Sequence, residues 1–343
     1  MIFQNSIVRF IAFFIPVKEM QENFIRSYSR KTNYRKLRDE NIKLKHEIEQ
    51  LKTQCRNISR EYKYLNYKYA LPEQRPQMLK DWYRGIMGET LDLENPQTFN
   101  EKIQWIKLND FDELNTKLVD KYLVKKWVKE KIGESHVIPL LGVYDIPDDI
   151  NWGALPKEFV IKCNHGSGWK IDVTDKKNID IVAINIKLSR WLNTTYGISG
   201  FELQYYKIPP KIIIEKKIHN KGHQDIIDYK FMCFNGKVKY IQVILDRSTN
   251  PTMVFYDTNW IKQTFVYMYP LYDKEIDKPA NLDDMISIAE KLSSDFKFVR
   301  VDLYRLDDGS IYFGEMTFTP HNGVIRWNEK DIDIKFGNLL RLK

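Results

Sequence analysis

The sequence predicts an α+β protein preceded by a long helical segment, and three features carry this expectation. Apolar residues recur every seven positions between residues 34 and 69, which is typical of a helix that pairs in a coiled coil. Further along, apolar runs flank Asn235-Gly236, the dipeptide most typical of a two-residue hairpin turn. A second pair of apolar runs flanks Asp308-Gly309. Helices and antiparallel strands are therefore expected in one chain.

The composition is that of a folded protein that binds an anion. Of the 343 residues, 43% are apolar and 13% aromatic, which allows a sizeable core. The 54 basic and 46 acidic residues leave a formal charge of +8, which favours a nucleotide, a sugar phosphate, a nucleic acid or an acidic lipid as partner. Because the sequence has no zinc-ligand spacing and no recognisable nucleic-acid module, we expect no nucleic-acid partner.

The three cysteines indicate a reducing compartment. Cys55, Cys163 and Cys233 are an odd number without paired spacing. One falls in a predicted helix and two in predicted strands, so we expect small buried apolar side chains in place of disulfides. The expected location is the cytoplasm, or the inner face of the cytoplasmic membrane.

The first 30 residues form an apolar and basic segment of their own. Residues 7–17 are strongly apolar but include Arg9 and Pro16, and they are shorter than the roughly 20 residues that span a bilayer. No cleavage site of small residues follows, which argues against a secretory signal. Two interpretations stay open: contact with a membrane surface, helped by the basic residues that follow, or a helix packed against a dimer partner.

Residues 31–70 are predicted to form a coiled coil. Leucine dominates the d positions and Asn41 occupies an a position, a register that favours a parallel two-stranded coil and therefore a homodimer. The alternative is a single amphipathic helix lying on the rest of the chain, for which this stripe is narrow. Leu71-Pro72 ends the helix. The d positions are Leu37, Leu44, Leu51, Ile58 and Leu65.

Residues 71–155 alternate helical patterns with turns. Thr98 and Glu101 have the spacing of a capping box, in which each side chain accepts a hydrogen bond from the backbone of the other. A helix is therefore expected to begin at this box. A second helix is expected from residue 119 to residue 131, with Lys121 on its first turns.

The strand and loop at residues 158–168 are typical of a phosphate-binding site. An apolar strand that contains Lys162 ends in His165, Gly166, Ser167 and Gly168. Glycine lets the backbone approach a ligand closely, and backbone N–H groups beside a lysine cation commonly cradle phosphate. Taken alone, the same pattern also fits a turn that closes a hairpin.

Two carboxylates are expected to meet on the second hairpin. Asp302 lies on the strand before the Asp308-Gly309 turn, and Glu315 lies on the strand after it. If both side chains point to one face they lie close together, and Mg²⁺ is usually held by one or two carboxylates plus substrate phosphates. The sequence therefore predicts a magnesium site beside a phosphate-binding loop.

Taken in order, these residues resemble the ATP-grasp superfamily, and the flanking segments resemble its TupA-like branch, found in teichuronopeptide and capsular polysaccharide synthesis. The resemblance covers the chain from about residue 75 to its C-terminus. One departure concerns the metal: Glu-x-Asn is usual on the second metal strand, whereas Thr317 stands two residues after Glu315 here. The segments that carry the resemblance are residues 95–105, 119–122, 162–168, 228–231, 300–302 and 314–320.

The resemblance implies an ATP-grasp fold, in which two α+β subdomains clamp ATP with Mg²⁺. It divides a catalytic domain at residues 71–343 into an N-terminal part (71–155), a small nucleotide-clamping subdomain (156–218) and a metal-binding part (219–343). Glu215 matches the hinge position next to the adenine amino group. A carboxylate at this position can accept a hydrogen bond from that amino group. The other implied roles are ATP binding by Lys121, Lys162, His165, Gly166, Ser167 and Gly168, metal binding by Asp302, Glu315 and Thr317, and catalysis by Arg300 and Lys230.

The implied reaction is an ATP-dependent ligation of a carboxylate to an amine through an acyl phosphate. The TupA-like branch points to a uronic acid of a surface polysaccharide, or of its nucleotide-sugar precursor, joined to an amino acid or another amine. Two alternatives are a glycosyltransferase of polysaccharide synthesis and a non-catalytic scaffold. A glycosyltransferase would not require Lys162 with its glycine loop, and its candidate Asp-x-Asp motif is residues 331–333. The presence of Lys162, Asp302 and Glu315 argues against a scaffold.

Overall fold

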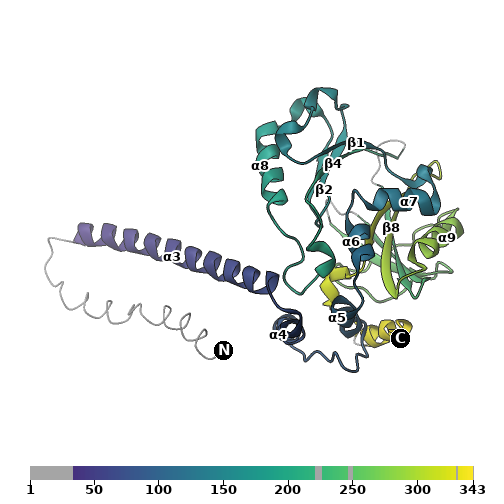
Figure 1. Cartoon of the computed structure of the whole chain (residues 1–343), viewed down its shortest axis with the longest axis horizontal. Coiled ribbons are helices and arrows are strands. Elements are labelled where there is room, and N and C mark those ends of the chain that lie inside the picture. The colour runs from purple at the N-terminus through teal and green to yellow at the C-terminus, as the bar shows by residue number, and fades with distance from the viewer. Residues whose placement is uncertain (1–33, 221–225, 246–249, 330, 343) are drawn as a thin grey trace. The chain divides into compact units, whose positions relative to one another are not determined.

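The computed structural model describes residues 34–220, 226–245, 250–329 and 331–342 (Figure 1). The chain divides into two units, Met1–Lys63 and Tyr64–Lys343. The apolar and basic segment expected at residues 1–30 lies outside the described residues. Within the described ranges, no helix combines the length and the apolar character that crossing a membrane requires.

The helix expected from the heptad pattern is present as α3, Tyr34–Lys68. A short 3-10 helix, Pro72–Gln74, follows it, in agreement with the stop predicted at Leu71-Pro72. Proline has no backbone N–H to donate, and it disfavours the helical conformation of the residue before it.

The four apolar d positions of α3 whose burial the structure describes, Leu44, Leu51, Ile58 and Leu65, are open to solvent in the single chain. Leu44 is 49% exposed, Leu51 52% and Ile58 66%. Cys55 on the same helix is also exposed, which corrects the expectation that all three cysteines are buried. The pairing of this helix with a second chain stays a prediction.

The second unit begins with short helices. One of these helices begins at the predicted capping box, with Thr98 as its N-cap. Thr98 Oγ1 accepts from Glu101 N at 3.2 Å, and Glu101 Oε2 accepts from Thr98 N at 2.9 Å. Together these bonds satisfy two backbone donors that a helix start leaves free. The helices are α4 (Arg75–Met87), α5 (Phe99–Asn109), α6 (Glu113–Val119) and α7 (Val124–Ile132).

The expected helix from residue 119 to residue 131 is interrupted, and Lys121 lies in the interruption. Asp120 leaves the helical conformation, and its Oδ1 accepts from the backbone N–H of Tyr122 at 2.8 Å and of Leu123 at 3.2 Å. An aspartate that bonds to nearby backbone groups competes with helix formation. Lys121 is therefore placed on a turn between α6 and α7.

The first sheet has four antiparallel strands in the order β1-β4-β2-β3. One face is covered by α8, Ile181–Leu192, whose Leu188 is buried among Phe159 and Ile161 of β2. Lys162 and Glu215 lie on the opposite face, because side chains alternate along a strand. The sequence did not predict β1. The strands are β1 (Leu140–Tyr144), β2 (Phe159–Cys163), β3 (Lys170–Val173) and β4 (Ile212–Lys216).

The second sheet has five antiparallel strands in the order β7-β6-β5-β8-β9. Both predicted hairpins are present. Asn235 and Gly236 have φ of 48° and 74°, the left-handed values of a tight hairpin turn. The strands are β5 (Asp228–Phe234), β6 (Lys237–Leu245), β7 (Thr252–Asp257), β8 (Phe298–Arg305) and β9 (Ile311–Thr317).

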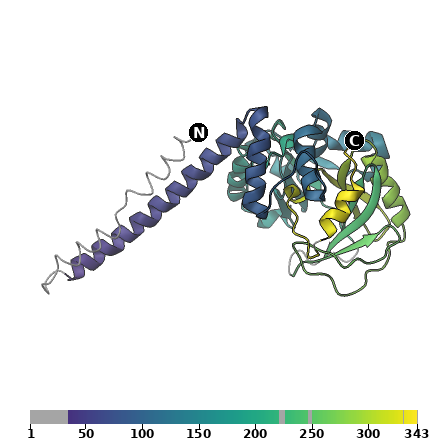
Figure 2. The ribbon, with the colours of Figure 1, turned by 90° about the horizontal axis from the view of Figure 1, so that it is seen from below.

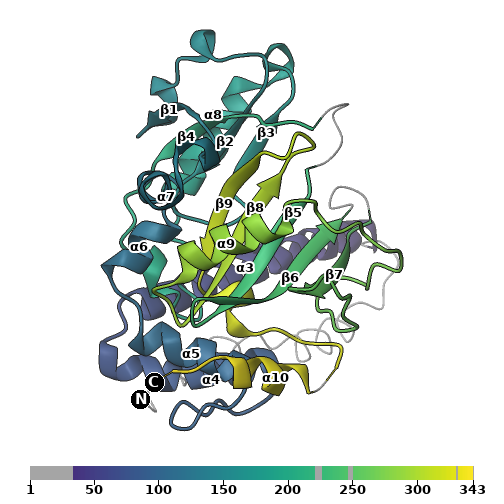
Figure 3. The ribbon, with the colours of Figure 1, turned by 90° about the vertical axis from the view of Figure 1, so that its right-hand side faces the viewer.

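Helices cover both faces of the second sheet. Figure 3 shows α9, Leu282–Ser293, lying across β5 and β8 on one face. On the other face, Phe99 of α5 and Phe336 of α10 pack against Phe234. The yellow C-terminal helix of Figure 2 is α10, Ile332–Leu339, which the sequence did not predict. This second face also carries the polar residues of the candidate site.

Candidate active site

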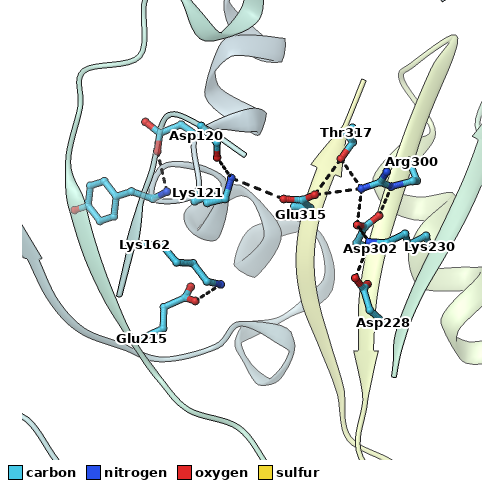
Figure 4. A network of polar contacts seen from close by, with 12 residues as sticks. Asp120, Lys121, Lys162, Glu215, Asp228, Lys230, Arg300, Asp302, Glu315 and Thr317 are labelled. Carbon is cyan, nitrogen blue, oxygen red and sulfur yellow. Dashed lines mark hydrogen bonds and ion pairs between the residues drawn. The ribbon is translucent and has the colours of Figure 1, made fainter. Parts of the chain in front are cut away.

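A row of polar residues crosses the second sheet at one level. The strand register places Lys230 of β5 between Gln242 of β6 and Asp302 of β8, and it places Asp302 next to Glu315 of β9. Residues directly opposite each other on neighbouring strands share one face of the sheet. The two carboxylates of the hairpin therefore lie on one face, and Figure 4 shows them with the cations around them.

A β-bulge at Gly314 shapes this hairpin. Asp302 pairs with Glu315, and the next residue, Leu303, pairs with Phe313. Gly314 therefore has no partner on β8, and the register shifts by one residue there. A Cβ at Gly314 would lie 3.0 Å from the backbone oxygen of Asp302. Bulges are frequent beside active sites, where they redirect a side chain. Here the missing side chain lets β9 stay close to β8 next to Glu315.

Asp302 is held between two cations. Arg300 binds it as a fork, with Nε donating to Oδ1 at 2.6 Å and Nη2 donating to Oδ2 at 2.7 Å. Lys230 Nζ donates to Asp302 Oδ2, and at 2.6 Å to Asp228 Oδ2. Because Asp302 is 1% exposed, its charge depends on these partners.

Glu315 is the more accessible carboxylate of the row. Its side chain is 34% exposed, and Oε1 accepts from Arg300 Nη2 at 3.2 Å and from Thr317 Oγ1 at 3.3 Å. Burial acts to raise the pKa of Glu315, but nearby cations outweigh it and lower the pKa to about 2. In order of effect, these cations are Lys121, Arg300, Lys230 and Lys162. At neutral pH the group is therefore an ionised carboxylate facing several cations.

The glycine-rich loop connects β2 to β3 on the first sheet. Gly166 has no room for a side chain, since a Cβ there would lie 2.4 Å from the ring of Trp169. Gly168 has a φ of 73°, in the left-handed region that favours glycine. Burial raises the pKa of Tyr196 to about 12, and the side chain of Ser167 acts in the opposite direction. Gly166 is therefore required by packing and Gly168 by its backbone conformation, while their predicted approach to a phosphate stays a prediction.

The imidazole of His165 holds the loop to the end of α8. His165 is 2% exposed, and its Nε2 lies 3.2 Å from the carbonyl oxygens of both Trp191 and Thr194. Burial lowers the pKa of this imidazole more than the carbonyls raise it. A contribution of His165 to phosphate binding would therefore come from its backbone N–H group.

Glu215 is a buried carboxylate with two lysine partners. Lys162 Nζ lies 2.6 Å from Oε2, and Lys125 Nζ lies 2.5 Å from Oε1. Burial raises the pKa of Glu215, but Lys162 and Lys125 together outweigh it and lower the pKa. Glu215 therefore orients Lys162, and its predicted contact with adenine stays a prediction.

Lys121 connects the glycine-rich loop to the metal hairpin, the β8–β9 hairpin that carries Asp302 and Glu315. Its Nζ donates to the carbonyl oxygen of Gly166 at 2.6 Å and lies 3.7 Å from Glu315 Oε2. Its backbone N–H donates to Asn164 O at 3.1 Å. The turn that interrupts the expected helix thus brings this lysine between the two sheets (Figure 4).

The carboxylate pair suits a hard divalent cation. Asp302, Glu315 and the hydroxyl of Thr317 offer oxygen ligands on one face, and Mg²⁺ prefers oxygen. The ionised, partly exposed Glu315 leaves room for phosphate oxygens in the same shell. Asn322 does not join this set, because its Oδ1 accepts from Lys107 Nζ. The donor set therefore fits Mg²⁺ bound together with phosphates.

The candidate Asp-x-Asp motif has a structural role. Asp333 lies in the first turn of α10, and its carboxylate accepts from the backbone N–H of Asn100 at 3.1 Å and from the Asn100 side chain at 3.0 Å. These bonds attach α10 to α5. No observation favours the glycosyltransferase alternative at this motif.

Two buried charged residues near the site, Lys107 and Glu202, and the partly buried Lys125 were not singled out by the sequence. Lys125 is one of several lysines on α7, and nothing local distinguishes it from Lys126 or Lys129. Lys107 lies on the apolar side of α5, where a buried cation is unusual, so an amphipathic pattern could have marked it. Glu202 lies in an irregular segment without any local pattern.

A scan against protein-family models matches residues 101–341 to the TupA-like ATPgrasp family. The matched segment contains both sheets, the glycine-rich loop and the metal hairpin. A search of the curated proteins finds no match for this chain.

Solved structures with a similar arrangement include a D-alanine–D-alanine ligase from Bacillus anthracis, at 21% identity, with 59% of this chain and 57% of that chain covered and a TM-score of 0.35. An N5-carboxyaminoimidazole synthase from Aspergillus clavatus, in complex with ADP and 5-aminoimidazole ribonucleotide, is 14% identical, with 59% of this chain and 44% of that chain covered and a TM-score of 0.32. An ADP complex of an N5-carboxyaminoimidazole ribonucleotide synthetase is 12% identical, with 71% and 58% covered and a TM-score of 0.39. The match spans about half the length of these chains.

Proposed function

The chain belongs to the TupA-like ATP-grasp family, and on this premise we propose that it is an ATP-dependent ligase that joins a carboxylate to an amine. The observation that carries the proposal is the position of Glu315. This ionised carboxylate lies 3.7 Å from Lys121, whose ammonium also binds the glycine-rich loop, and it neighbours Asp302 across the strands. A phosphate-binding loop and a magnesium-type carboxylate pair are thereby joined through a single lysine.

ATP is proposed to lie between the two sheets. The backbone N–H groups of residues 165–168 and the ammonium groups of Lys121 and Lys162 would hold its phosphates. Lys162 Nζ lies 2.6 Å from Glu215 Oε2, and this ion pair fixes the orientation of the cation. Asp302, Glu315 and Thr317 would hold Mg²⁺. When bound, Mg²⁺ neutralises charge on phosphate oxygens and orients them.

The proposed reaction has two steps. A carboxylate oxygen of the acceptor attacks the γ-phosphorus of ATP, the bond to the bridging oxygen breaks, and ADP leaves an acyl phosphate behind. The amine nitrogen then attacks the acyl carbon, the bond to the phosphate oxygen breaks, and inorganic phosphate and one proton are released. Arg300 and Lys230 place positive charge beside the transferring group, and such electrostatic positioning is the main catalytic term in phosphoryl transfer.

The acceptor is proposed to be a uronic acid of a surface polysaccharide or of its nucleotide-sugar precursor, and the amine an amino acid or a similar compound. The support is the TupA-like branch of the family, and the formal charge of +8 suits an anionic sugar partner. A cytoplasmic location, or one at the inner face of the cytoplasmic membrane, would give the enzyme access to nucleotide sugars.

A homodimer is part of the proposal. The support is the row of exposed apolar side chains on α3, since Leu44, Leu51 and Ile58 at heptad spacing are typical of a helix that meets a partner helix. A parallel pair would place two catalytic units at the same end of the coil.

The test is ADP release by the purified protein with ATP and Mg²⁺, against nucleotide-linked uronic acids crossed with amino acids. We expect ADP and phosphate release that depends on both a uronic acid and an amine. A hexose without the carboxylate, such as the corresponding nucleotide-linked glucose, is the matched control. Equal ADP release with the uronic acid and with the hexose control would contradict the proposed acceptor. So would a lack of ADP release with every compound of the panel, if the protein binds ATP.

A further inference from the structure

The turn that follows β9 has an unusual backbone. His321, Asn322 and Gly323 have φ of 49°, 56° and 63°, so three successive residues adopt the left-handed region. Residues with side chains rarely adopt it, and they persist there when their surroundings hold them, often at functional sites. The turn lies in the 3-10 segment Pro320–Gly323, a few residues beyond Glu315 and Thr317.

A buried lysine holds this turn. Lys107 of α5 is 0% exposed, and its Nζ donates to Asn322 O at 2.7 Å, to Asn322 Oδ1 and to Gly200 O at 3.0 Å. A further bond at 2.8 Å goes to Gln104 Oε1. An ammonium has three hydrogens to donate, so four acceptors use its capacity fully. Such a cation is retained in a core only where its partners are fixed.

The other side of the turn is held as well. Thr319 Oγ1 donates to Glu202 Oε1 at 2.6 Å and accepts from Gln204 Nε2 at 3.0 Å. Asn322 Nδ2 donates to Ser199 O at 2.9 Å. Lys107 and Glu202 are buried on the two sides of the turn. Burial lowers the pKa of Lys107 to about 7 and raises the pKa of Glu202, and each group opposes the shift of the other. The backbone between them therefore has little freedom to change its conformation.

The held turn presents His321 beside the polar row of the second sheet. Its imidazole packs edge-on against Tyr267 with ring centroids 4.7 Å apart, and Tyr267 Oη donates to Gln242 Oε1 at 3.1 Å. Gln242 is the neighbour of Lys230 in the row. The residue as a whole is exposed. Its pKa is lowered to about 4, by burial of the ring first and then by the cations Arg300 and Lys230.

The two ends of the row differ in what they face. Glu315 faces Lys121 and the glycine-rich loop, where the proposed function places the phosphates of ATP. His321 and Tyr267 stand at the other end, beyond Lys230. In phosphoryl transfer the attacking and leaving oxygens are roughly in line on opposite sides of the phosphorus. An acceptor carboxylate would therefore approach from the end of His321.

We propose that the turn carrying His321 forms a wall of the acceptor carboxylate's site, and that Lys107 is a positioning residue that holds this wall through Asn322. The inference rests on the proposed function, because it needs ATP at the opposite end of the row. Lys107 itself touches neither substrate. Its role is to keep a left-handed turn in place that would otherwise relax.

The first test measures the position of His321 without any acceptor. Histidine titrations by NMR are compared for the wild type, Asn322→Gly and Lys107→Met. Glycine tolerates the left-handed backbone, so Asn322→Gly removes the side-chain bond without adding strain. We expect the pKa of His321 to move from about 4 toward its usual 6.5 in both variants, because the imidazole then becomes better solvated and also moves away from Arg300 and Lys230. An unchanged pKa in both variants overturns the positioning role.

Lys102→Met is the matched control. Lys102 lies on the same helix, and its Nζ donates to Gly337 O at 2.7 Å and to Leu340 O at 2.8 Å, so it holds α10 and not the turn. If any lysine of α5 that binds backbone carbonyls affected the turn, Lys102→Met would also change the pKa of His321. We expect the pKa of His321 to be unchanged in Lys102→Met. A shift as large as that in Lys107→Met would also overturn the inference.

The second test separates acceptor binding from ATP binding. With UDP-glucuronic acid and an amino acid as probes, Asn322→Gly should raise the acceptor KM by about ten-fold or more, since misplacement by about 1 Å can cost as much as a hundred-fold. The KM for ATP and the thermal shift by ATP should stay unchanged. Equal losses for both substrates, or an unchanged acceptor KM, overturn the acceptor wall. If the wild type binds no ATP, the proposed function fails, while the His321 titration still decides the role of Lys107.

Discussion

Lys121 and Glu315 come from opposite sides of the candidate site, and the Nζ of Lys121 lies 3.7 Å from Oε2 of Glu315. The same Nζ donates to the carbonyl oxygen of Gly166 at 2.6 Å. The lysine thus couples the glycine-rich loop of the first sheet to the carboxylate hairpin of the second. Because it also has the largest part in lowering the pKa of Glu315, it prepares an ionised ligand beside the loop.

Replacing this lysine should weaken ATP binding. Lys121→Met removes a charge-assisted contact worth about 1.5–3 kcal/mol, so we expect the KM for ATP to rise about ten- to hundred-fold. The measurement is steady-state ADP release at varied ATP. Lys126→Met is the control, since Lys126 is a highly exposed lysine on α7 with its own partner, Glu130. An unchanged KM for ATP in Lys121→Met would exclude its phosphate contact.

The two carboxylates should differ in what their loss does to stability. Glu315→Gln should abolish ADP release, and it should lower the free energy of unfolding less than Asp302→Asn does, because the Glu315 side chain is 34% exposed. Asp302→Asn should abolish turnover too, but it leaves Arg300 and Lys230 buried with a neutral partner, which costs about 3–5 kcal/mol. Urea unfolding and ADP release at saturating Mg²⁺ measure both effects. Turnover near that of the wild type in either variant would refute its role as a metal ligand.

Glu315 should contribute to acid sensitivity. Its pKa is lowered from the usual 4.5 to about 2 in the folded protein, so its contribution to stability is fully present above pH 4.5 and is lost as the pH falls toward 2. The free energy of unfolding of Glu315→Gln should therefore fall less steeply than that of the wild type between pH 4.5 and pH 2. Urea titrations across this range measure the two slopes. Parallel slopes would show that the cations around Glu315 do not stabilise its charge.

Nucleotide should stabilise the folded protein selectively. ATP with Mg²⁺ should raise the melting temperature, since a ligand that binds only the native state stabilises it, and GTP should raise it less. The reason is Glu215, a carboxylate that accepts from the adenine amino group and offers nothing to the guanine carbonyl. The side-chain amide of Glu215→Gln can also donate a hydrogen bond, so this variant should show a smaller difference between the melting-temperature shifts caused by ATP and by GTP. Equal shifts with ATP and GTP in the wild type would rule out Glu215 as the base-reading group.

The exposed stripe on α3 should make the protein a dimer. Light scattering of the full chain should give twice the mass of one chain, and Leu51→Glu with Ile58→Glu should give a monomer, because charged side chains at d positions disrupt the seam. Lys45→Glu, at another exposed position of the same helix, is the control and should remain dimeric. A monomeric wild type would remove the coiled coil from the proposal.

Elements with local causes could be predicted from the sequence. The capping box at Thr98, the Asn235-Gly236 turn and Gly168 of the loop each depend on backbone geometry over a few residues. The pairing of Asp302 with Glu315 belongs here too, because a hairpin determines which residues of its own strands are neighbours. Elements without a local pattern, such as β1 and α10, were missed.

The partners of the charged residues could not be predicted from the sequence. Lys162 and Glu215 were recognised by position, but their ion pair with each other and with Lys125 depends on how α7 packs beside the first sheet. The bonds from Lys107 to Asn322 likewise depend on the approach of α5 to the end of β9. Local backbone preferences act over a few residues, whereas ion pairs and buried hydrogen bonds form between segments that only tertiary packing brings together. The sequence by itself therefore determined the hairpins and the strand that leads into the glycine-rich loop, and the tertiary structure decided which charged side chains pair with one another.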